Sequence, residues 1–353
     1  MNILAQKIIA WQKQYGRHDL PWQTKLNEVR NPYAIWVSEI MLQQTQVAAV
    51  INYYRRFMVA FPDIASLAEA TQEEVLQQWS GLGYYARARN LHSAAQKVVD
   101  DFGGVFPQKF ADILSLPGIG RSTAAAISTF AFAIPQPILD GNVKRVFARY
   151  FLVEGWTSAP KVEAMLWQLA ELEMPNKKMV AYTQGLMDLG ATICTRSKPK
   201  CGQCPLQTNC KANAQNLTST LPTPKKRQQI PHKQTTMLLM CHGNEVLLEK
   251  RPARGVWGGL WSLPEIEMHE IATEVAQHRY YLMVETNEPL QIIQHVFTHF
   301  KLAITPQPLQ VLHKSDNTVT NTIWITLENA IDAAIPTPVR TILQTIKHTQ
   351  YHT

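Results

Sequence analysis

Apolar residues recur at helical intervals through about the first 211 residues of this 353-residue chain. Prolines fall between the periodic segments, at Pro62, Pro107 and Pro175 among others. A proline cannot continue a helix because it lacks the backbone N–H and clashes with the preceding turn. The pattern therefore predicts short helices joined by turns, and we expect an all-α domain.

A different spacing follows, in which apolar and polar residues alternate as they do in strands. Residues 242–245, His-Gly-Asn-Glu, separate two such runs and are typical of a hairpin turn. The strand-like ranges are 235–241, 246–250, 294–305 and 322–327, and residues 339–348 return to a helical pattern. We therefore expect a smaller α+β domain at the C-terminal end.

The segment between these two parts reads as a linker. It contains Pro222, Pro224 and a basic triplet at 225–227, and it has no apolar periodicity. The prediction is a domain over 1–215, a basic, proline-containing linker over 216–234 and a second domain over 235–353.

The composition excludes two classes of protein. A hydrophobic content of 46% is too high for a largely disordered chain. The sequence contains no stretch of about 18 consecutive apolar residues, the length that a membrane-spanning helix needs. The first residues do not resemble a signal peptide, so we expect a soluble protein of the bacterial cytoplasm that associates with the nucleoid.

The positive charge is unevenly distributed. Residues 1–211 hold 22 Lys and Arg against 16 Asp and Glu, residues 212–234 hold four basic and no acidic residues, and residues 235–353 hold 8 against 11. A polyanion such as nucleic acid would bind this excess with release of counterions. Ordinary solubility accounts for the charge equally well, so both interpretations stay open.

Four of the five cysteines are Cys194, Cys201, Cys204 and Cys210, in the spacing C-x6-C-x2-C-x5-C. Four thiolates within 17 residues can surround one compact metal centre. Structural zinc sites usually have two close cysteine pairs and this segment has one, so the spacing modestly favours an iron–sulfur cluster over zinc. Cys241 stands apart and is interpreted as a small buried residue.

Three further patterns carry candidate chemistry. In a helix predicted from Asn31-Pro32 through Val47, the polar residues Glu39, Gln43 and Gln46 share one face. That face can recognise base edges, or it can simply meet water. Asp140 is a predicted helix N-cap, and a carboxylate there can either stabilise the helix alone or stabilise a developing cation.

The third pattern is Leu116-Pro117-Gly118-Ile119-Gly120, followed by the start of a helix and three alanines. The exposed N–H groups of such a helix start can bind a phosphate, with Gly118 and Gly120 allowing the tight turn. This is the pattern of a helix-hairpin-helix DNA element. A merely structural turn between two helices is the alternative.

Together these features resemble the endonuclease III and MutY branch of the helix-hairpin-helix DNA glycosylases, over residues 1–215. The stretches 38–46, Ser-Glu-Ile-Met-Leu-Gln-Gln-Thr-Gln, and 81–91, which begins Gly-Leu-Gly-Tyr-Tyr, resemble the MutY members in particular. The resemblance implies a [4Fe–4S] cluster on the four cysteines. It also implies a MutT-like (Nudix-like) fold for 235–353.

For activity, the resemblance implies excision of adenine opposite 8-oxoguanine or guanine in double-stranded DNA, by base flipping. Glu39 would be the general acid, and Asp140, supported by Asn142, would stabilise the oxocarbenium-like sugar. Among the DNA-binding residues, Gln44 and Tyr84 match those that enter the base stack, Gly118 and Gly120 match the phosphate contacts, and Gln43 lies beside them. The protein is expected to act as a monomer.

Ser122 occupies the position at which bifunctional relatives carry a Schiff-base lysine. A serine has no amine to form the imine, so the sequence predicts a monofunctional glycosylase. The alternatives are a bifunctional glycosylase with lyase activity and a non-catalytic sensor of DNA lesions. Residues 23–31 form a longer loop than the family usually has.

The second domain contains Gly258-Gly259-Leu260-Trp261, which resembles the opening of a Nudix box. The Arg-Glu and Glu-Glu pairs that would hold Mg²⁺ do not follow, so no hydrolase activity is expected. By resemblance, Phe297, Thr298 and His299 correspond to a Phe-Ser-His element that recognises 8-oxoguanine. Thr298 keeps the hydroxyl of the serine and adds a methyl group.

Overall fold

The computed structural model describes residues 2–23, 30–225, 229–314, 317 and 319–350. By their contacts, the residues form two compact units: an N-terminal unit of Met1–Glu69 and Asn90–Arg227, and a C-terminal unit of Ala70–Arg89 and Gln228–Thr353. Residues 24–29 of the predicted long loop, and Lys226 and Arg227 of the basic triplet, lie outside the described residues. The domain boundaries given above stay a prediction.

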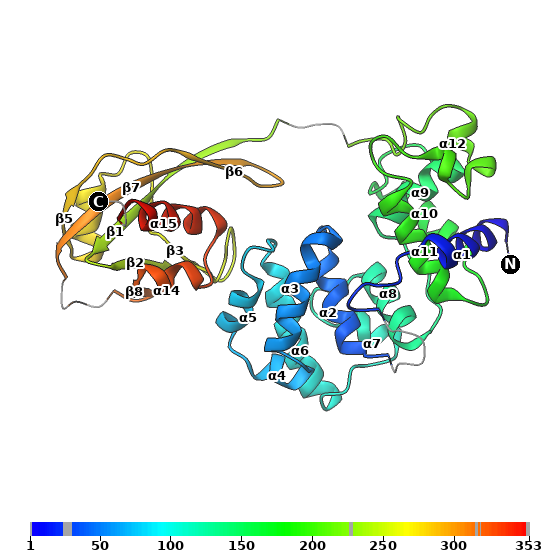
Figure 1. The fold of residues 1–353 in the computed structure, drawn as a ribbon, viewed down its shortest axis with the longest axis horizontal. Helices are drawn as coiled ribbons and strands as arrows, with labels where there is room; N and C mark the ends of the chain where they lie inside the picture. The colour runs from blue at the N-terminus through cyan, green and yellow to red at the C-terminus, as the bar shows by residue number, and fades with distance from the viewer. Residues whose placement is uncertain (1, 24–29, 226–228, 315–316, 318, 351–353) are drawn as a thin grey trace. The chain divides into compact units, whose positions relative to one another are not determined.

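The described part of the N-terminal unit is helical, as the spacing of its apolar residues predicts (Figure 1). Its helices are α1 (Ile3–Tyr15), α2 (Pro32–Leu42), α3 (Val47–Ala60), α4 (Ile64–Glu69), α6 (Ala86–Phe102), α7 (Phe110–Leu114), α8 (Arg121–Phe132), α9 (Gly141–Phe151), α10 (Pro160–Leu172), α11 (Met179–Thr192) and α12 (Lys211–Ala214), with short 3₁₀ turns η1 (Cys201–Gln203) and η2 (Gln207–Asn209). The first residues of α6 belong to the C-terminal unit.

Helix α2 begins as predicted and ends earlier than predicted. The Asn31 side chain accepts a hydrogen bond from the backbone N–H of Ala34, and Pro32 occupies the first turn. The helix stops at Leu42, and Gln44 adopts a positive φ of 58°. The prediction of one helix through Val47 was therefore wrong, because a turn at Gln43–Thr45 separates α2 from α3.

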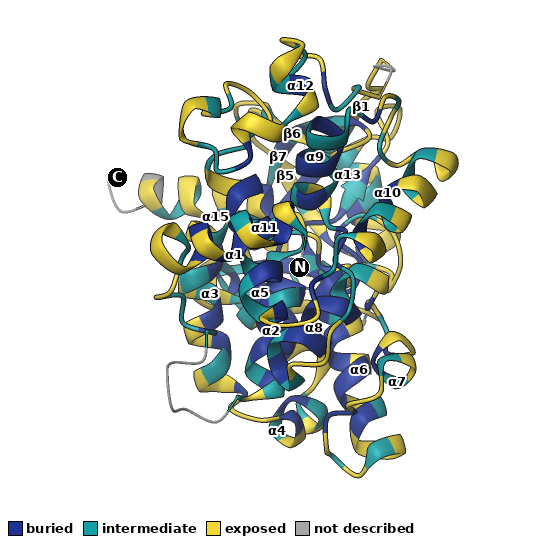
Figure 2. Cartoon of the chain, turned by 90° about the vertical axis from the view of Figure 1, so that its right-hand side faces the viewer, coloured by how far each residue is buried: buried dark blue, intermediate teal, exposed yellow. Residues whose placement is uncertain are grey.

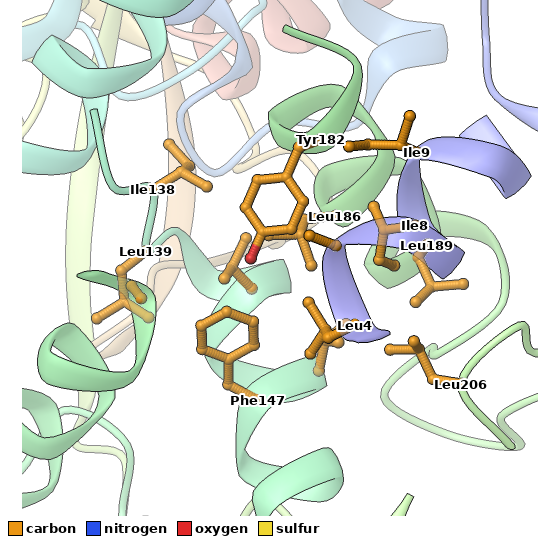
Figure 3. Packing of buried hydrophobic residues seen from close by; sticks show 14 of the residues in the cluster. Leu4, Ile8, Ile9, Ile138, Leu139, Phe147, Tyr182, Leu186, Leu189 and Leu206 are labelled. Atoms are coloured by element: carbon orange, nitrogen blue, oxygen red, sulfur yellow. The ribbon is translucent and has the colours of Figure 1, made fainter. Parts of the chain in front are cut away.

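One hydrophobic core cluster of the N-terminal unit lies where α1, α9 and α11 meet. Figure 3 shows Leu4, Phe147, Tyr182 and Leu206 among the side chains packed there. Figure 2 shows dark blue, buried stretches on these helices and on α8, where the three alanines at 124–126 are buried. Small residues at these positions let α8 pack closely against its neighbours.

The C-terminal unit contains a mixed sheet together with helices α5 (Gln72–Trp79), α13 (Ala272–Tyr280), α14 (Leu327–Asp332) and α15 (Thr337–Gln350). Its strands are β1 (His232–His242), β2 (Glu245–Lys250), β3 (Trp261–Ser262), β4 (Glu265–Ile266), β5 (Met283–Thr286), β6 (Ile293–Val296), β7 (Lys301–His313) and β8 (Thr322–Thr326). The order β3-β2-β1-β7-β5 describes the main path, with β1 and β7 parallel. The expected α+β fold is confirmed.

Two predicted strand regions can be compared directly with the sheet. The hairpin is confirmed, since Cys241 pairs with Val246 and His242 with Glu245 in antiparallel register. The range 294–305, expected to be one strand, is instead the hairpin β6–β7, in which the Phe297 N–H donates to the Phe300 carbonyl at 2.9 Å. Among the described residues, none of the helices is both long and apolar enough to cross a membrane.

Candidate active site

A cavity of about 630 Å³ in the N-terminal unit is lined by several of the residues that the sequence singles out. They come from α2 and the turn after it, from α8, and from α9 and the residue just before it: Glu39, Gln43, Ser122, Asp140 and Asn142. These positions span more than 100 residues of sequence, and the fold brings them to one surface. Gln46, which was expected to share the face of Glu39, is the N-cap of α3 and lines the same cavity.

Glu39 lies near the end of α2, and part of its side chain remains open to the cavity. The surrounding protein atoms disfavour the ionised form, and the negative charge of Asp140 adds to this effect. Burial and then Asp140 together raise the pKa of Glu39 to about 8. At neutral pH this carboxyl group therefore carries a proton, as a general acid must.

Asp140 is the N-cap of α9, as predicted. Its Oδ1 accepts a hydrogen bond from the Val143 N–H at 2.7 Å, and its Oδ2 accepts one from Asn142 Nδ2 at 3.3 Å. Burial raises the pKa of Asp140, while these hydrogen bonds and the nearby Arg145 guanidinium act in the opposite direction. The two hydrogen bonds and the Arg145 guanidinium thus favour the ionised form of Asp140, whereas burial opposes it.

Asn142 is itself held in place. Arg145 Nη2 donates to Asn142 Oδ1 at 2.8 Å and to the Gly190 carbonyl at 2.6 Å. A Cβ atom on Gly190 would lie 2.5 Å from Asn142 Cβ, which is too close for any side chain. The absence of a side chain at Gly190 lets α11 approach the start of α9, where Asp140 lies.

The glycines of the turn before α8 leave the start of that helix open. Gly118 has a positive φ of 79°, and a Cβ there would lie 2.8 Å from Asn90 Cβ, so the turn requires glycine. Gly120 is the N-cap of α8, makes no side-chain cap and faces open space. Gln43 Nε2 contacts the Gly118 carbonyl and Thr123 Oγ1, each at 3.3 Å, and so joins the hairpin to α2.

Gln44 and Tyr84 share an unusual backbone conformation, although they belong to different units. Their φ values are 58° and 50°, in a region that residues other than glycine rarely adopt. Gln44 is exposed, and the Tyr84 side chain is 51% exposed. Each side chain is therefore presented to solvent by a strained turn.

Phe297, Thr298 and His299 form the turn between β6 and β7 in the C-terminal unit. Phe297 stacks on Phe300 with ring centroids 4.4 Å apart, and its ring lies 5.3 Å from that of Trp257. Thr298 and His299 are exposed at the tip. The aromatic packing anchors a turn whose two polar side chains stay accessible.

The four cysteines follow α11 in one loop and interact electrostatically with each other. Burial raises the pKa of Cys204 to about 12, and the other three thiols act in the same direction. Buried Arg149 contacts the loop: its Nη1 lies 3.3 Å from Cys194 Sγ and 2.8 Å from the Thr195 carbonyl. A buried cation beside four thiols that repel one another as anions suits a negatively charged centre.

No group of three or more His, Cys, Asp or Glu side chains in the described ranges is arranged to hold a single metal ion. What supports a cluster at the four cysteines is their mutual electrostatic interaction and the Arg149 guanidinium beside Cys194.

Two residues that line the cavity, and a third that binds both of them, were not predicted from the sequence. Arg17 and Gln184 line it, and both are bound by Asp188, whose Oδ1 accepts from Arg17 Nη2 at 2.6 Å and from Gln184 Nε2 at 2.9 Å. Gln184 also lines a second cavity, of about 600 Å³, that borders Glu39. For Gln184 and Asp188, the available signal in the sequence was their spacing of four positions on α11, a helix in which most other residues are apolar.

In the C-terminal unit the carboxylates near the glycine-rich stretch are already paired. Glu265 Oε1 accepts from Arg251 Nη1 at 2.5 Å, and Glu249 accepts two hydrogen bonds from Arg279 Nη2, at 2.7 and 3.0 Å. Arginine side chains thus pair with both of these carboxylates, which lie beside a cavity of about 840 Å³.

Comparison with protein families matches three parts of the chain. Residues 37–172 match the HhH-GPD superfamily of base excision DNA repair proteins, 194–210 the iron–sulfur binding domain of endonuclease III, and 235–345 the NUDIX domain. The cysteine positions and the two-part architecture predicted from the sequence agree with these matches.

The chain is also similar along most of its length to individual proteins. It is 37% identical over 329 residues to the adenine DNA glycosylase of Buchnera aphidicola subsp. Acyrthosiphon pisum, covering 93% of both chains. It is 33% identical over 388 residues to the adenine DNA glycosylase of Rattus norvegicus, covering 93% of this chain and 75% of the other.

Among solved structures, a thermostable thymine-DNA glycosylase is 31% identical with a TM-score of 0.54, over 60% of this chain and 96% of the other. Endonuclease III in a non-covalent DNA complex matches with a TM-score of 0.50 at 20% identity, over 60% of this chain and 94% of the other. The second match shows a common fold.

Proposed function

This chain belongs to the adenine DNA glycosylases, enzymes of base excision repair, and from that premise we propose that it releases adenine paired with 8-oxoguanine or guanine as a monofunctional, monomeric enzyme. The observation that carries the proposal is the pairing of Glu39 and Asp140 in one cavity, where burial and Asp140 raise the pKa of Glu39 to about 8. The match of residues 194–210 to the iron–sulfur binding domain of endonuclease III indicates a cluster, and we propose the four cysteines of this range as its ligands.

The first step is protonation of the leaving base. Adenine is a poor leaving group as an anion, and the target nucleotide must be flipped out of the duplex before any side chain reaches it. Glu39, protonated at neutral pH, donates its proton to N7 of the flipped adenine. The N-glycosidic bond then breaks, its electron pair leaves with the base, and the sugar becomes oxocarbenium-like.

The second step is capture of that cation. Asp140 carries the negative charge that stabilises it, and the Val143 N–H, Asn142 and Arg145 favour the ionised form of Asp140. Glu39, now a carboxylate, accepts a proton from water as the water oxygen bonds to the anomeric carbon. Free adenine and an abasic site result, and both carboxyl groups return to their starting states.

The position of Gln184 supports a role for this residue in binding the base. Its amide lines the cavity beside Glu39, and the hydrogen bond to Asp188 fixes which way it points. With one N–H donated to Asp188, the amide still offers a second N–H donor and a carbonyl acceptor, which match the edge of adenine. We assign Gln184 to base recognition together with Gln43.

Ser122 supports the monofunctional assignment. It lines the cavity, and among the described residues around that cavity there is no lysine to attack the sugar as an amine. The expected result is that borohydride traps no efficient covalent enzyme–DNA complex. Efficient trapping would contradict the assignment.

DNA is held, in this proposal, by the N–H groups at the start of α8 and by two side chains that enter the base stack. Gly118 and Gly120 leave the helix start open to a phosphate. Gln44 and Tyr84, each exposed on a turn with positive φ, fill the space left by the flipped base. These contacts allow the protein to bind DNA whatever the base sequence around the target nucleotide.

The C-terminal unit is proposed to read the opposing base and not to hydrolyse nucleotides. The exposed tip, Thr298 and His299, offers hydrogen-bonding groups that can distinguish 8-oxoguanine from guanine. The Arg-Glu and Glu-Glu pairs that a hydrolase would use for Mg²⁺ do not follow the glycine-rich stretch, and the nearby Glu265 and Glu249 are bound by Arg251 and Arg279. Excising adenine from the two pairs with Thr298→Ala/His299→Ala tests this: the preference for 8-oxoguanine should shrink.

Cys194, Cys201, Cys204 and Cys210 would hold the cluster, which would supply a rigid anionic centre to this loop. Arg149 balances that charge from the core side. Arg196, Lys198 and Lys200 lie within the loop, and their positive charge suits a surface that faces DNA.

The test of the proposed function is adenine release under single-turnover conditions, with enzyme in excess over an 8-oxoguanine:adenine duplex. The parent protein should release adenine, and Glu39→Gln should bind the duplex and release adenine slower by about 10²–10⁴-fold, the usual contribution of a positioned acid. Release by Glu39→Gln at the parental rate would remove Glu39 from the mechanism.

A further inference from the structure

The stretch Gly258–Trp261 resembles the opening of a Nudix box, yet the catalytic carboxylates of such a box do not follow it. In the structure it contacts a distant part of the sequence. Residues 70–89 fall within the superfamily match that covers the glycosylase part, but by their contacts they belong to the C-terminal unit. Their partners include the glycine-rich stretch.

Gly259 allows the backbone to approach α5 closely. Its φ is 78°, and a Cβ there would lie 3.2 Å from Gln72 Nε2 and 3.5 Å from the Leu76 side chain. Gly258, one residue earlier, accepts a hydrogen bond from Arg89 Nη1 at 2.7 Å. The two glycines thus meet both ends of the segment that runs from α5 to the start of α6.

Trp261 and its strand neighbour Lys250 bind the first turn of α5. Glu73 Oε1 accepts from Trp261 Nε1 and Glu73 Oε2 from Lys250 Nζ, each at 2.6 Å. Lys250 Nζ also lies 4.9 Å from the centre of the Trp261 ring. Burial acts to raise the pKa of Glu73, but the bonds from Lys250 and Trp261 outweigh it and lower that pKa.

The far end of α5 is bound by another part of the same unit. Ser80 Oγ accepts from Arg340 Nη2 at 2.8 Å and donates to the Ile335 carbonyl at 3.2 Å. Gln77 Nε2 donates to the Asp332 carbonyl at 3.2 Å. Both ends of α5 are therefore fixed to the C-terminal unit.

Tyr84 lies on the loop that this arrangement fixes. The Arg87 guanidinium carbon is 5.4 Å from the centre of the Tyr84 ring and 5.3 Å from that of Trp79, the last residue of α5. At the other end of the ring, Tyr84 Oη is 3.4 Å from Thr298 Oγ1. The loop thus links α5 to the turn that carries the proposed lesion-reading residues.

We propose that Gly258–Trp261 is a docking face for residues 70–89, with Glu73 as a positioning residue that places Tyr84 beside Thr298. In this proposal the stretch acts in structure and not in hydrolysis. The consequence for Tyr84 on DNA rests on the proposed function; the docking itself does not.

The first test measures docking alone, by amide hydrogen exchange of the full-length, cluster-loaded protein without DNA. The double variant Glu73→Gln/Trp261→Phe removes the charge and the indole donor and keeps the side chains close to their size. Exchange in 72–80 should become about tenfold faster, as for a loss of about 1.4 kcal/mol in local stability. Gly259→Ala, which disturbs the same contact through the backbone, should act in the same direction.

The matched control is Glu245→Gln. Glu245 is paired with Lys314, which lies 4.5 Å from the centre of the Trp324 ring, so the same three residue types interact within the sheet. This variant should leave exchange in 72–80 unchanged. Unchanged exchange in both test variants, while they remain folded by circular dichroism, would overturn the docking face.

The second test measures positioning, by single-turnover adenine release from 8-oxoguanine:adenine duplexes. The double variant should be slower by about tenfold, since misplacing a binding group costs up to about 10²-fold, and Glu245→Gln should match the parent. Faster exchange in 72–80 with unchanged release would refute the positioning of Tyr84. Absence of release by the parent would be a failure of the proposed function, and the exchange result would still decide the docking face.

Discussion

The raised pKa of Glu39 predicts how adenine excision depends on pH. With a pKa of about 8, about 90% of Glu39 is protonated at pH 7, compared with about 0.3% for a glutamic acid with its ordinary pKa of 4.5. The cavity thus increases the population of the acid about 300-fold at neutral pH. At pH 9 the protonated fraction falls to about 9%.

The perturbation is pH alone, and the assay is the single-turnover rate with saturating enzyme, which reports the chemical step. The rate should fall about tenfold between pH 7 and pH 9, because the general acid loses its proton. At low pH the rate should also fall, because Asp140 becomes protonated and loses the charge that stabilises the sugar cation. Burial raises the pKa of Asp140, so this fall begins at a higher pH than for an ordinary aspartate. The two limbs belong to the coupled pair and not to either residue alone.

Glu39→Gln provides the control, since its amide does not titrate in this range. Its residual rate should lack the decline between pH 7 and pH 9. A parental rate that stays constant or rises across that interval would refute the reasoning, because the protonated form of Glu39 would then not be the active one.

Three further predictions concern stability and the geometry of the site. Gly190→Ala introduces a Cβ 2.5 Å from Asn142 Cβ, so the free energy of unfolding should fall by about 1–3 kcal/mol and excision should slow, as measured by denaturant melts and adenine release. Arg149→Met leaves the Leu221 and Thr195 carbonyls without their donor, which should lower the free energy of unfolding by about 1–3 kcal/mol for each lost partner. The melting temperature and the visible absorbance of the cluster should both decrease. Because the folded state favours protonated Glu39, its stabilising contribution is complete below pH 4.5 and is lost as pH rises through about 8, so Glu39→Gln should raise the melting temperature more at pH 9 than at pH 5.

Several local features could be predicted from the sequence because their causes are local. Asn31-Pro32 and Asp140 start helices through side-chain caps that need only a few neighbouring residues. The four cysteines are defined by spacing, and the 235–250 hairpin by two turn residues between alternating runs. These features can therefore be predicted from the sequence without knowing the fold.

Other features depend on distant contacts. The end of α2 was missed because Gln44 takes a left-handed conformation inside a polar run that looks helical. The β6–β7 turn was missed because alternation continues through Phe297–Phe300, where ring stacking closes the turn. Gln184 acquires its place at the cavity through Asp188 and through Arg17, which lies 171 residues before Asp188 in sequence.

The central claim is that Glu39 protonates N7 of the departing adenine, and a substrate lacking that nitrogen tests it most directly. In 7-deazaadenine a C–H group replaces N7, so the base can pair but cannot accept the proton there. Opposite 8-oxoguanine, with enzyme in excess at pH 7, the parent protein should bind this duplex as tightly as the adenine duplex and release no base. Release of 7-deazaadenine at a rate comparable to that of adenine would contradict the account.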